Sequence, residues 1–245
     1  MLTIVSEKLA RELASWIGEM VSSAGRKGVV LGMSGGVDSS VAAVLCKRAL
    51  PQAILGVIMP CYSSKLDREH AELVASRFHI PVEVVVLDDV FDTLIKVLPS
   101  NSYEAATRKL AESNIKPRLR MLTLYYFANR LNYLVVGSGN RSELTVGYFT
   151  KYGDGGVDIM PLGNLVKSQV RELARNLGIP REIIEKPPSA GLWEGQTDEA
   201  ELGVTYNELD RYLIEGVAEQ ALKVKIGSMI SKCAHKRQLP LVPQM

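Results

Sequence analysis

The chain alternates short apolar runs with longer stretches in which apolar residues recur every three or four positions. The apolar runs lie at residues 28–33, 53–60, 81–88 and 133–137 and are rich in β-branched residues. Continuous runs of this kind are typical of strands buried on both faces. Helical spacing fills intervening stretches such as 37–50 and 66–79. Strands and helices in alternation predict an α/β fold with a parallel, doubly wound sheet.

Two further helical patterns raise questions of packing. Leu9, Leu13, Trp16, Ile17 and Met20 recur at helical spacing, and we expect this opening helix to pack on the sheet that follows. Residues 118–132 are apolar around most of a helix, which is more than one sheet face requires. The second face of that helix needs a partner, either another helix of the same chain or a second copy of the chain.

Beyond residue 137 the alternation loosens into a glycine-rich and charged stretch before a helix over 168–177, which Gly178 ends. Residues 186–203 are long for a loop without secondary structure, which indicates either a functional lid or a passive connector. Thr205 and Glu208 fit a capping box for a late helix, and another helix follows towards Cys233.

Composition narrows the class of protein. The chain has 245 residues, enough for one large domain, and its 29 Lys and Arg against 27 Asp and Glu do not favour a nucleic-acid surface. Cys46, Cys61 and Cys233 are too scattered for a disulfide scaffold or a structural zinc site. No signal peptide is evident, and nowhere do about 18 apolar residues run together. We therefore expect a cytoplasmic protein that does not enter a membrane.

The stretch LGMSGGVDSSVAA, residues 31–43, passes from a strand through glycines into a helix. In a parallel sheet such a junction lies at the carboxyl end of a strand, where ligands bind. Gly35 and Gly36 permit close approach, the helix N-terminus offers free amides, and Ser34, Ser39 and Ser40 add hydroxyls. These features predict a phosphate cradle.

A helix N-terminus contributes only about 0.3–2 kcal/mol towards holding an anion, so a polyphosphate needs further cations. Asp38 would repel a bare phosphate but fits a site in which Mg²⁺ lies between carboxylate and phosphate. The alternative is structural, with Ser34 capping the helix and Asp38 complementing its dipole. No Gly-Lys-Ser/Thr closes the stretch, so it is not a Walker A loop.

The segment SGGVDSS resembles the pyrophosphate-binding loop of the ATP pyrophosphatases, which cut ATP between its α and β phosphates. Residues 137–174 and 186–210, together with HKR at 235–237, resemble the matching parts of ammonia-dependent NAD synthetases. The resemblance implies a single domain over 1–245, without a glutaminase domain, that converts deamido-NAD, ATP and ammonia into NAD, AMP and pyrophosphate. It also implies a five-stranded, mostly parallel sheet with helices on both faces, of the adenine nucleotide alpha hydrolase type, and a homodimer.

The same resemblance assigns roles to individual residues. Asp38 and Glu143 would hold Mg²⁺, and with Lys167 they would carry the catalysis. Deamido-NAD would contact Arg118, Lys151, Asp158, His235 and Lys236. The ATP site would comprise Gly32, Met33, Ser34, Gly35, Gly36, Val37, Asp38 and Ser39, with Ser138, Lys167 and Ser189.

Physical reasoning supports some of these roles and leaves others open. Glu143 lies just beyond the strand at 133–137, and it shares a crevice with Asp38 if that strand neighbours residues 28–33; otherwise it is a surface charge. Lys151 and Lys167 supply the missing positive charge, or are merely solvated. His235 near a helix end is favourable without any ligand.

Two other functions compete with this one. A tRNA-modifying enzyme of the same superfamily would normally need reactive cysteines and a basic surface, and the sequence shows neither. A non-catalytic module that senses ATP would need the loop but no convergence of Asp38, Glu143 and Lys167.

Overall fold

The computed structural model describes residues 2–99, 105–193, 195–240 and 242–243, without the side chains of residues 2–6 and 105–106. Its centre is a parallel sheet of four strands in the order β3-β2-β1-β4. The four apolar runs of the sequence form these strands. They are β1 (Gly28–Gly32), β2 (Ile54–Ile58), β3 (Val82–Val84) and β4 (Tyr133–Val136).

The expected fifth strand is wrong for the part of the chain that the structure describes. Where it would extend the sheet, β4 makes only an isolated bridge between Val136 and Ile159. The Asp158 side chain accepts the Val135 amide at 2.7 Å, which a neighbouring strand's carbonyl would otherwise use. The ladder therefore stops after one bridge.

The third strand also differs from the expectation of a long, doubly buried run. Strand β3 has three residues, pairs only with β2 and leaves Val84 40% exposed. It is an edge strand, so one side of its backbone has no strand to pair with. The chain turns into the next helix at Asp88.

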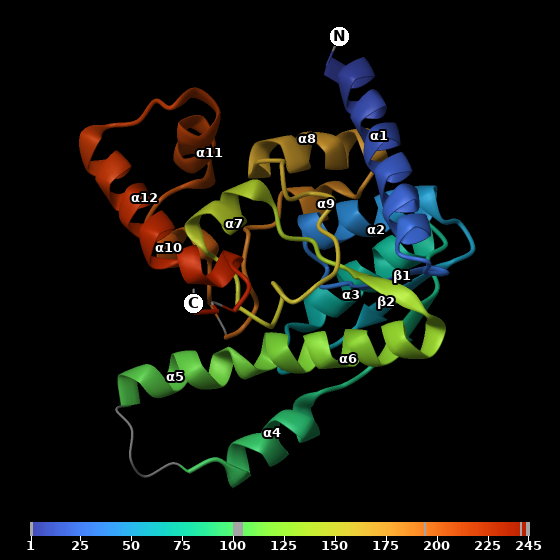
Figure 1. Ribbon diagram of the computed structural model, residues 1–245, viewed down its shortest axis with the longest axis horizontal. Helices are drawn as coiled ribbons and strands as arrows, with labels where there is room; N and C mark the ends of the chain where they lie inside the picture. Colours follow the sequence, from blue (N-terminus) through green and yellow to red (C-terminus); the bar gives the residue numbers. More distant parts are fainter. Residues whose placement is uncertain (1, 100–104, 194, 241, 244–245) are drawn as a thin grey trace.

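Helices cover both faces of the sheet (Figure 1). Val29 and Leu31 point into a core shared with the helices of one face, whereas Val30 points to the other face, as the alternation of a strand requires. The first face carries α2 (Val37–Ala49), α3 (Lys65–Arg77) and α8 (Lys167–Leu177). The second carries α4 (Asp88–Val97) and α6 (Ile115–Leu131), and α5 (Ala105–Ser113) contacts α6.

The opening helix α1 (Leu2–Ser23) shares the core of the first sheet face, as expected, but its main contacts are with helices. It lies outside α2 and α8 and contacts both of them. Ala10, Ile17 and Val21 are its buried residues, whereas Leu9 and Leu13 are only partly buried. The helices α2 and α8 already cover this face of the sheet, so the apolar stripe of α1 is buried in a third layer.

The apolar surface of helix α6 is partly buried within the chain itself. Leu119, Leu124 and Ala128 are buried against the sheet, and α4 and α5 contact the helix from the same chain. Leu122 and Tyr126 nevertheless remain 64% and 55% exposed. Helices of the same chain therefore cover this helix only in part.

A group of later helices forms a lobe beside the carboxyl edge of the sheet (Figure 1). Val146, Leu202, Leu209 and Ile226 are buried together at its centre. The lobe comprises α7 (Arg141–Val146), α10 (Asp198–Leu202), α11 (Tyr206–Glu215), α12 (Gln220–Lys232) and a 3₁₀ helix η1 (Ala234–Arg237). Helix α9 (Arg181–Ile184) instead follows α8 and is buried in the core of the first sheet face. The predicted capping box at Thr205 and the end at Gly178 are confirmed.

The strand order fixes where a ligand can bind. From β1 the chain proceeds to β2 and β3 on one side and returns to β4 on the other, so β1 and β4 are adjacent and in parallel register. The chain leaves the carboxyl end of β1 towards β2, and it leaves the carboxyl end of β4 in the other direction, where Val136 bridges to Ile159. Such a topological switch point between two adjacent strands is where a crevice opens in folds of this kind. None of the helices among the described residues is long and apolar enough to cross a membrane.

A buried carboxylate joins the lobe to the sheet layer. Asp210 of α11 is 3% exposed, accepts a hydrogen bond from the Ser142 hydroxyl at 2.5 Å and accepts the Ser168 amide at 2.7 Å. The Ser142 hydroxyl oxygen in turn accepts the Lys167 amide at 3.1 Å. Asp210 thereby fixes the start of α8 against α7.

We expect Asp210→Ala to lower the free energy of unfolding by about 1.5–3 kcal/mol, the value of a hydrogen bond to a charged group. Denaturant unfolding of the two proteins measures it. Glu215→Ala on the same helix removes an exposed partner of Arg211 and should cost less than about 1 kcal/mol. Equal effects of the two substitutions would contradict the role of Asp210.

Candidate functional site

A cavity of about 1300 Å³ opens at the switch point. The loop after β1, the start of α2, the segment after β4 and residues 186–196 all contribute to its walls, apart from residue 194, which is not among the described residues. This volume exceeds the range of about 300–1000 Å³ usual for a pocket that holds one small molecule. The cavity is therefore large enough for more than one substrate.

The loop over 33–36 has the geometry of an anion cradle. Gly35 has φ +76°, and a Cβ on it would lie 2.1 Å from the Asp67 carbonyl oxygen, so a side chain is excluded. Gly36 is the N-cap of α2 and makes no side-chain cap bond. The N-cap residue therefore offers no side chain to the first amides of α2, which lie at the cavity beside Ser34.

The three serines of this loop play different parts. Ser34 lines the cavity and its hydroxyl lies 2.9 Å from that of Ser39. The hydroxyls of Ser39 and Ser40 both donate to the Gly36 carbonyl, at 3.0 and 2.8 Å. Ser40 is buried against the helix. Its expected role as a donor to the ligand is not supported, because that hydroxyl proton is already used within the helix.

Asp38, Glu143 and Lys167 come together in space, although Asp38 precedes Lys167 by 129 positions in the sequence and Glu143 precedes it by 24. The Lys167 ammonium lies 2.5 Å from Asp38 Oδ2 and 3.2 Å from Glu143 Oε1. Lys167 is the first residue of α8, Asp38 lies in the first turn of α2, and Glu143 is in the first turn of α7. The adjacency of β1 and β4 brings the two carboxylates to one edge, as the sequence predicted.

The charges in this cluster are strongly perturbed. Burial raises the pKa of Glu143 to about 7, although Lys167 opposes the shift. Burial alone would lower the pKa of Lys167, but Asp38 and Glu143 outweigh it and raise that pKa. Lys167 therefore stays charged and holds the two carboxylates at a common cation position.

This cation position suits Mg²⁺. The ion favours hard oxygen ligands and usually binds one or two carboxylates together with substrate phosphates and water. Among the described residues, no group of three or more Asp, Glu, His or Cys side chains is placed to hold a metal ion. A metal here would need ligands from the substrate as well as Asp38 and Glu143.

Three residues of the cluster were not singled out from the sequence. The Tyr206 hydroxyl lies 2.9 Å from Asp198 Oδ2 and 3.3 Å from Glu143 Oε1, and the Lys167 ammonium lies over the Tyr206 ring. Asn140 caps α7 and contacts Asp38. A capping box at Asn140 and Glu143 was detectable from the sequence, whereas the contacts of Tyr206 and Asp198 depend on the packing of the lobe.

Ser138 and Ser189 both line the cavity, together with Gly32, Met33 and Val37 of the predicted ATP site. Ser138 follows β4 directly. Ser189 lies in the segment before α10, where its hydroxyl oxygen accepts the Gly191 amide at 3.1 Å. The segment 186–203 is thus not wholly irregular as expected, since its last residues form α10.

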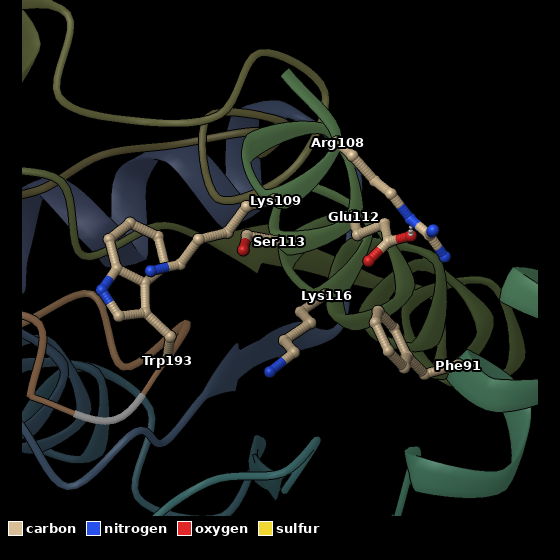
Figure 2. Close-up of a pocket in the computed structure, with 7 residues that line it drawn as sticks. All are labelled: Phe91, Arg108, Lys109, Glu112, Ser113, Lys116 and Trp193. Atoms are coloured by element: carbon tan, nitrogen blue, oxygen red, sulfur yellow. Dashed lines mark hydrogen bonds and ion pairs between the residues drawn. The ribbon is translucent and has the colours of Figure 1, made fainter. Parts of the chain in front are cut away.

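The segment over 186–197 is fastened at several points. Lys186 forms an ion pair with Asp67 of α3. The Lys116 ammonium donates to the Leu192 carbonyl at 2.8 Å. Lys109 lies 4.6 Å from the centre of the Trp193 ring, in a side pocket of about 320 Å³ (Figure 2).

The five residues assigned to deamido-NAD are only partly brought together. Arg118 donates to the Lys151 carbonyl, and Lys151 donates to the His235 carbonyl at 2.6 Å. Lys236 lines the cavity and donates to the carbonyls of Gly147 and Phe149. Asp158 lies apart from these contacts, since it bonds to the Val135 amide and the Tyr125 hydroxyl.

The chain is similar to known proteins along nearly its whole length. A family model described as NAD synthase matches residues 9–240. The NH(3)-dependent NAD(+) synthetase of Carboxydothermus hydrogenoformans is 49% identical over 98% of each chain. The NMN synthetase of Francisella tularensis superposes with a TM-score of 0.91 at 36% identity, covering 98% of this chain and 99% of that one.

The solved NH3-dependent NAD synthetase of Campylobacter jejuni has a TM-score of 0.79 and 29% identity, with 98% of this chain and 99% of that chain covered. The family match spans the cradle, the three converging charges and the C-terminal lobe. The chain belongs to the NAD synthase family.

Proposed function

We propose that this chain is an ammonia-dependent NAD synthetase, which amidates deamido-NAD with ATP and ammonia and releases AMP and pyrophosphate. The observation that carries the proposal is the convergence of Asp38, Glu143 and Lys167 beside the anion cradle. Near-full-length similarity to curated NH(3)-dependent NAD(+) synthetases supports the same reaction.

The chemistry requires activation before amidation. A nicotinate carboxylate is ionised at neutral pH, so ammonia does not displace its oxygen directly. One carboxylate oxygen attacks the α-phosphorus of ATP, and the bond from that phosphorus to the bridging oxygen breaks as pyrophosphate leaves with the electron pair. Ammonia then attacks the acyl carbon, AMP leaves with its oxygen, and the nitrogen loses a proton.

The chain's own residues fit these two steps. The amides at residues 36–39 bind the leaving pyrophosphate, and Lys167 stabilises the charge that develops on it. Mg²⁺ held by Asp38 and Glu143 supplies further electrostatic stabilisation of the phosphates. Ser138 and Ser189 complete the ATP site as neutral donors.

Arg118, Lys151, Asp158, His235 and Lys236 remain our proposed contacts for deamido-NAD. Their separation suits a substrate that crosses from one subunit to another. Leu122 and Tyr126 of α6 offer an exposed apolar face for a second copy of the chain. We therefore include in the proposal a cytoplasmic homodimer that takes free ammonia, or ammonia from a separate protein, as the curated relatives' dependence on NH(3) suggests.

The high structural similarity to an NMN synthetase favours a second candidate substrate. NMN is the mononucleotide half of NAD, so its acid form carries the same nicotinate carboxylate. The two substrates share the cradle and the three charges and differ only in the adenylate half. Which substrate is preferred therefore depends on whether the region beyond the ATP site binds the adenylate half.

The rival functions are less favoured. The three cysteines are buried, and burial raises the pKa of Cys46 to about 12 and also raises that of Cys61. Neither thiol is activated for a sulfur transfer to tRNA. An ATP sensor would not need the converging cluster of Asp38, Glu143 and Lys167.

Purified protein with ATP, Mg²⁺, ammonium and deamido-NAD should release AMP and NAD in equal amounts, as chromatography of the products measures. AMP release should need deamido-NAD, because the acid is the acceptor of the adenylate. A higher kcat/KM for the mononucleotide acid would assign NMN synthesis instead. ATP binding without turnover of either acid would indicate a sensor, and equal rates with glutamine and ammonium would contradict the nitrogen source.

Lys167 lies between Asp38 and Glu143 at the cation position, so Lys167→Met should raise the affinity of the protein for Mn²⁺, measured without nucleotide, at least about tenfold. Two unit charges about 4 Å apart interact by about 4 kcal/mol at an effective dielectric constant of 20, and the contacts of Lys167 are shorter than that. Turnover should fall about 100- to 1000-fold, because the charge on pyrophosphate is no longer stabilised.

Electron paramagnetic resonance of Mn²⁺ measures this affinity. Lys65→Met removes the same charge from a side chain that is 92% exposed and should change neither quantity more than twofold. Wild-type affinity in the Lys167 variant would refute the competition between lysine and metal.

In this proposal the segment 186–203 acts as a lid over the ATP site, since Ser189 and its described neighbours at 186–193 and 195–196 line the cavity. ATP with deamido-NAD should then slow proteolytic nicking within this segment several-fold, as gel electrophoresis of timed digests shows. Unchanged nicking with both ligands bound would leave the segment as a connector.

A further inference from the structure

Asn140 contacts both proposed metal ligands. It is fully buried at the junction between β4 and α7, and it is the N-cap of α7. Its side-chain oxygen accepts the Glu143 amide at 3.0 Å, and its side-chain nitrogen donates to Asp38 Oδ1 at 2.9 Å. Its own amide donates to Glu143 Oε2 at 3.3 Å.

In each of the two carboxylates, one oxygen accepts from Asn140 and the other accepts from Lys167. Oδ1 of Asp38 accepts from the Asn140 side chain and Oδ2 accepts from Lys167. Oε2 of Glu143 accepts from the Asn140 backbone amide and Oε1 accepts from Lys167. One oxygen of each carboxylate is thus fixed by the same residue, and the other oxygen of each points to the common cation position.

The helix cap alone does not explain an asparagine here. Serine, threonine and aspartate also cap helices well. An amide side chain, however, offers an acceptor and donors on one rigid plane. Aspartate would set a carboxylate against Asp38, and serine is too short to reach Asp38 while it accepts the Glu143 amide. Asparagine performs both tasks at once.

We propose that Asn140 is a positioning residue of the metal site, which orients Asp38 and Glu143 so that Oδ2 and Oε1 converge on one cation. This inference rests on the proposed function, because it takes Asp38 and Glu143 as the metal ligands. Asn140 is itself fully buried and does not line the cavity. Groups that orient metal ligands in this way typically change metal affinity or activity 10- to 100-fold when they are replaced.

The decisive variant is Asn140→Ser, which keeps a neutral cap on α7 and loses the donor to Asp38. We expect the affinity for Mn²⁺ in the presence of ATP, measured by electron paramagnetic resonance, to fall 10- to 100-fold, with a matching loss of kcat. Thermal unfolding should show that the variant is folded. Asn140→Ala should lose the same affinity and more stability, because it loses the cap as well.

A cap-only role makes the opposite prediction, namely that serine restores the wild-type affinity that alanine loses. Asn132→Ala is the control for a general loss of stability, since Asn132 ends α6 with φ +58° at the amino end of β4, opposite the metal ligands, and should leave Mn²⁺ affinity within twofold of wild type. Asn140→Thr is a second neutral cap that gives the same decision if the serine variant does not fold.

A double-mutant cycle separates this inference from a general loss of structure. In an Asp38→Ala background, Asn140→Ser should lower Mn²⁺ affinity much less than it does alone, because the ligand that it orients is already gone. Full additivity, or wild-type affinity in Asn140→Ser, would overturn the inference and leave the proposed function intact. Wild-type protein that binds no Mn²⁺ with ATP would overturn both.

Discussion

The ion pairs of Lys167 with Asp38 and Glu143 are the interaction on which the site depends. Bringing two carboxylates together in a partly buried place is unfavourable unless a cation lies between them. The lysine meets that requirement in the protein without substrate, at 2.5 and 3.2 Å from the two oxygens. The same requirement favours a divalent cation at this position. The two carboxylates therefore need positive charge both to stay together in the folded protein and to bind a metal ion.

The neutral side chains of Asn140 and Ser142, together with the carboxylate of Asp210, position these three charges. Asp210 fixes the start of α8 through Ser142 and the Ser168 amide, which sets where Lys167 begins. Asn140 sets where α7 begins and therefore where Glu143 lies. Three helix N-termini thus meet at the cavity, and Asp38, Glu143 and Lys167 lie in the first turns of α2, α7 and α8. Their amides favour anions, which suits a site for phosphates.

In the proposed reaction the cradle and the three charges bind ATP and the activated carboxylate, and a second region distinguishes the nucleotide that carries this carboxylate. Similarity to both NAD synthetases and an NMN synthetase is consistent with this division. The residues near Lys151 and His235 lie outside the ATP end and are held to each other through backbone carbonyls. We therefore expect selection between the two acids to depend on that region and not on the three converging charges.

The sequence by itself determined the strands, most helices and the cradle, because burial period, glycine position and capping residues act over a few neighbouring positions. It also predicted that Asp38 and Glu143 share a crevice, since parallel strands end at one edge of a sheet. It could not determine that Asp158 would take the Val135 amide and end the sheet, or that α1 would pack on helices. Tyr206, Asp198 and the double role of Asn140 also came only from the tertiary structure. These features depend on contacts between distant segments, and no local pattern encodes the distance between two side chains that different elements carry.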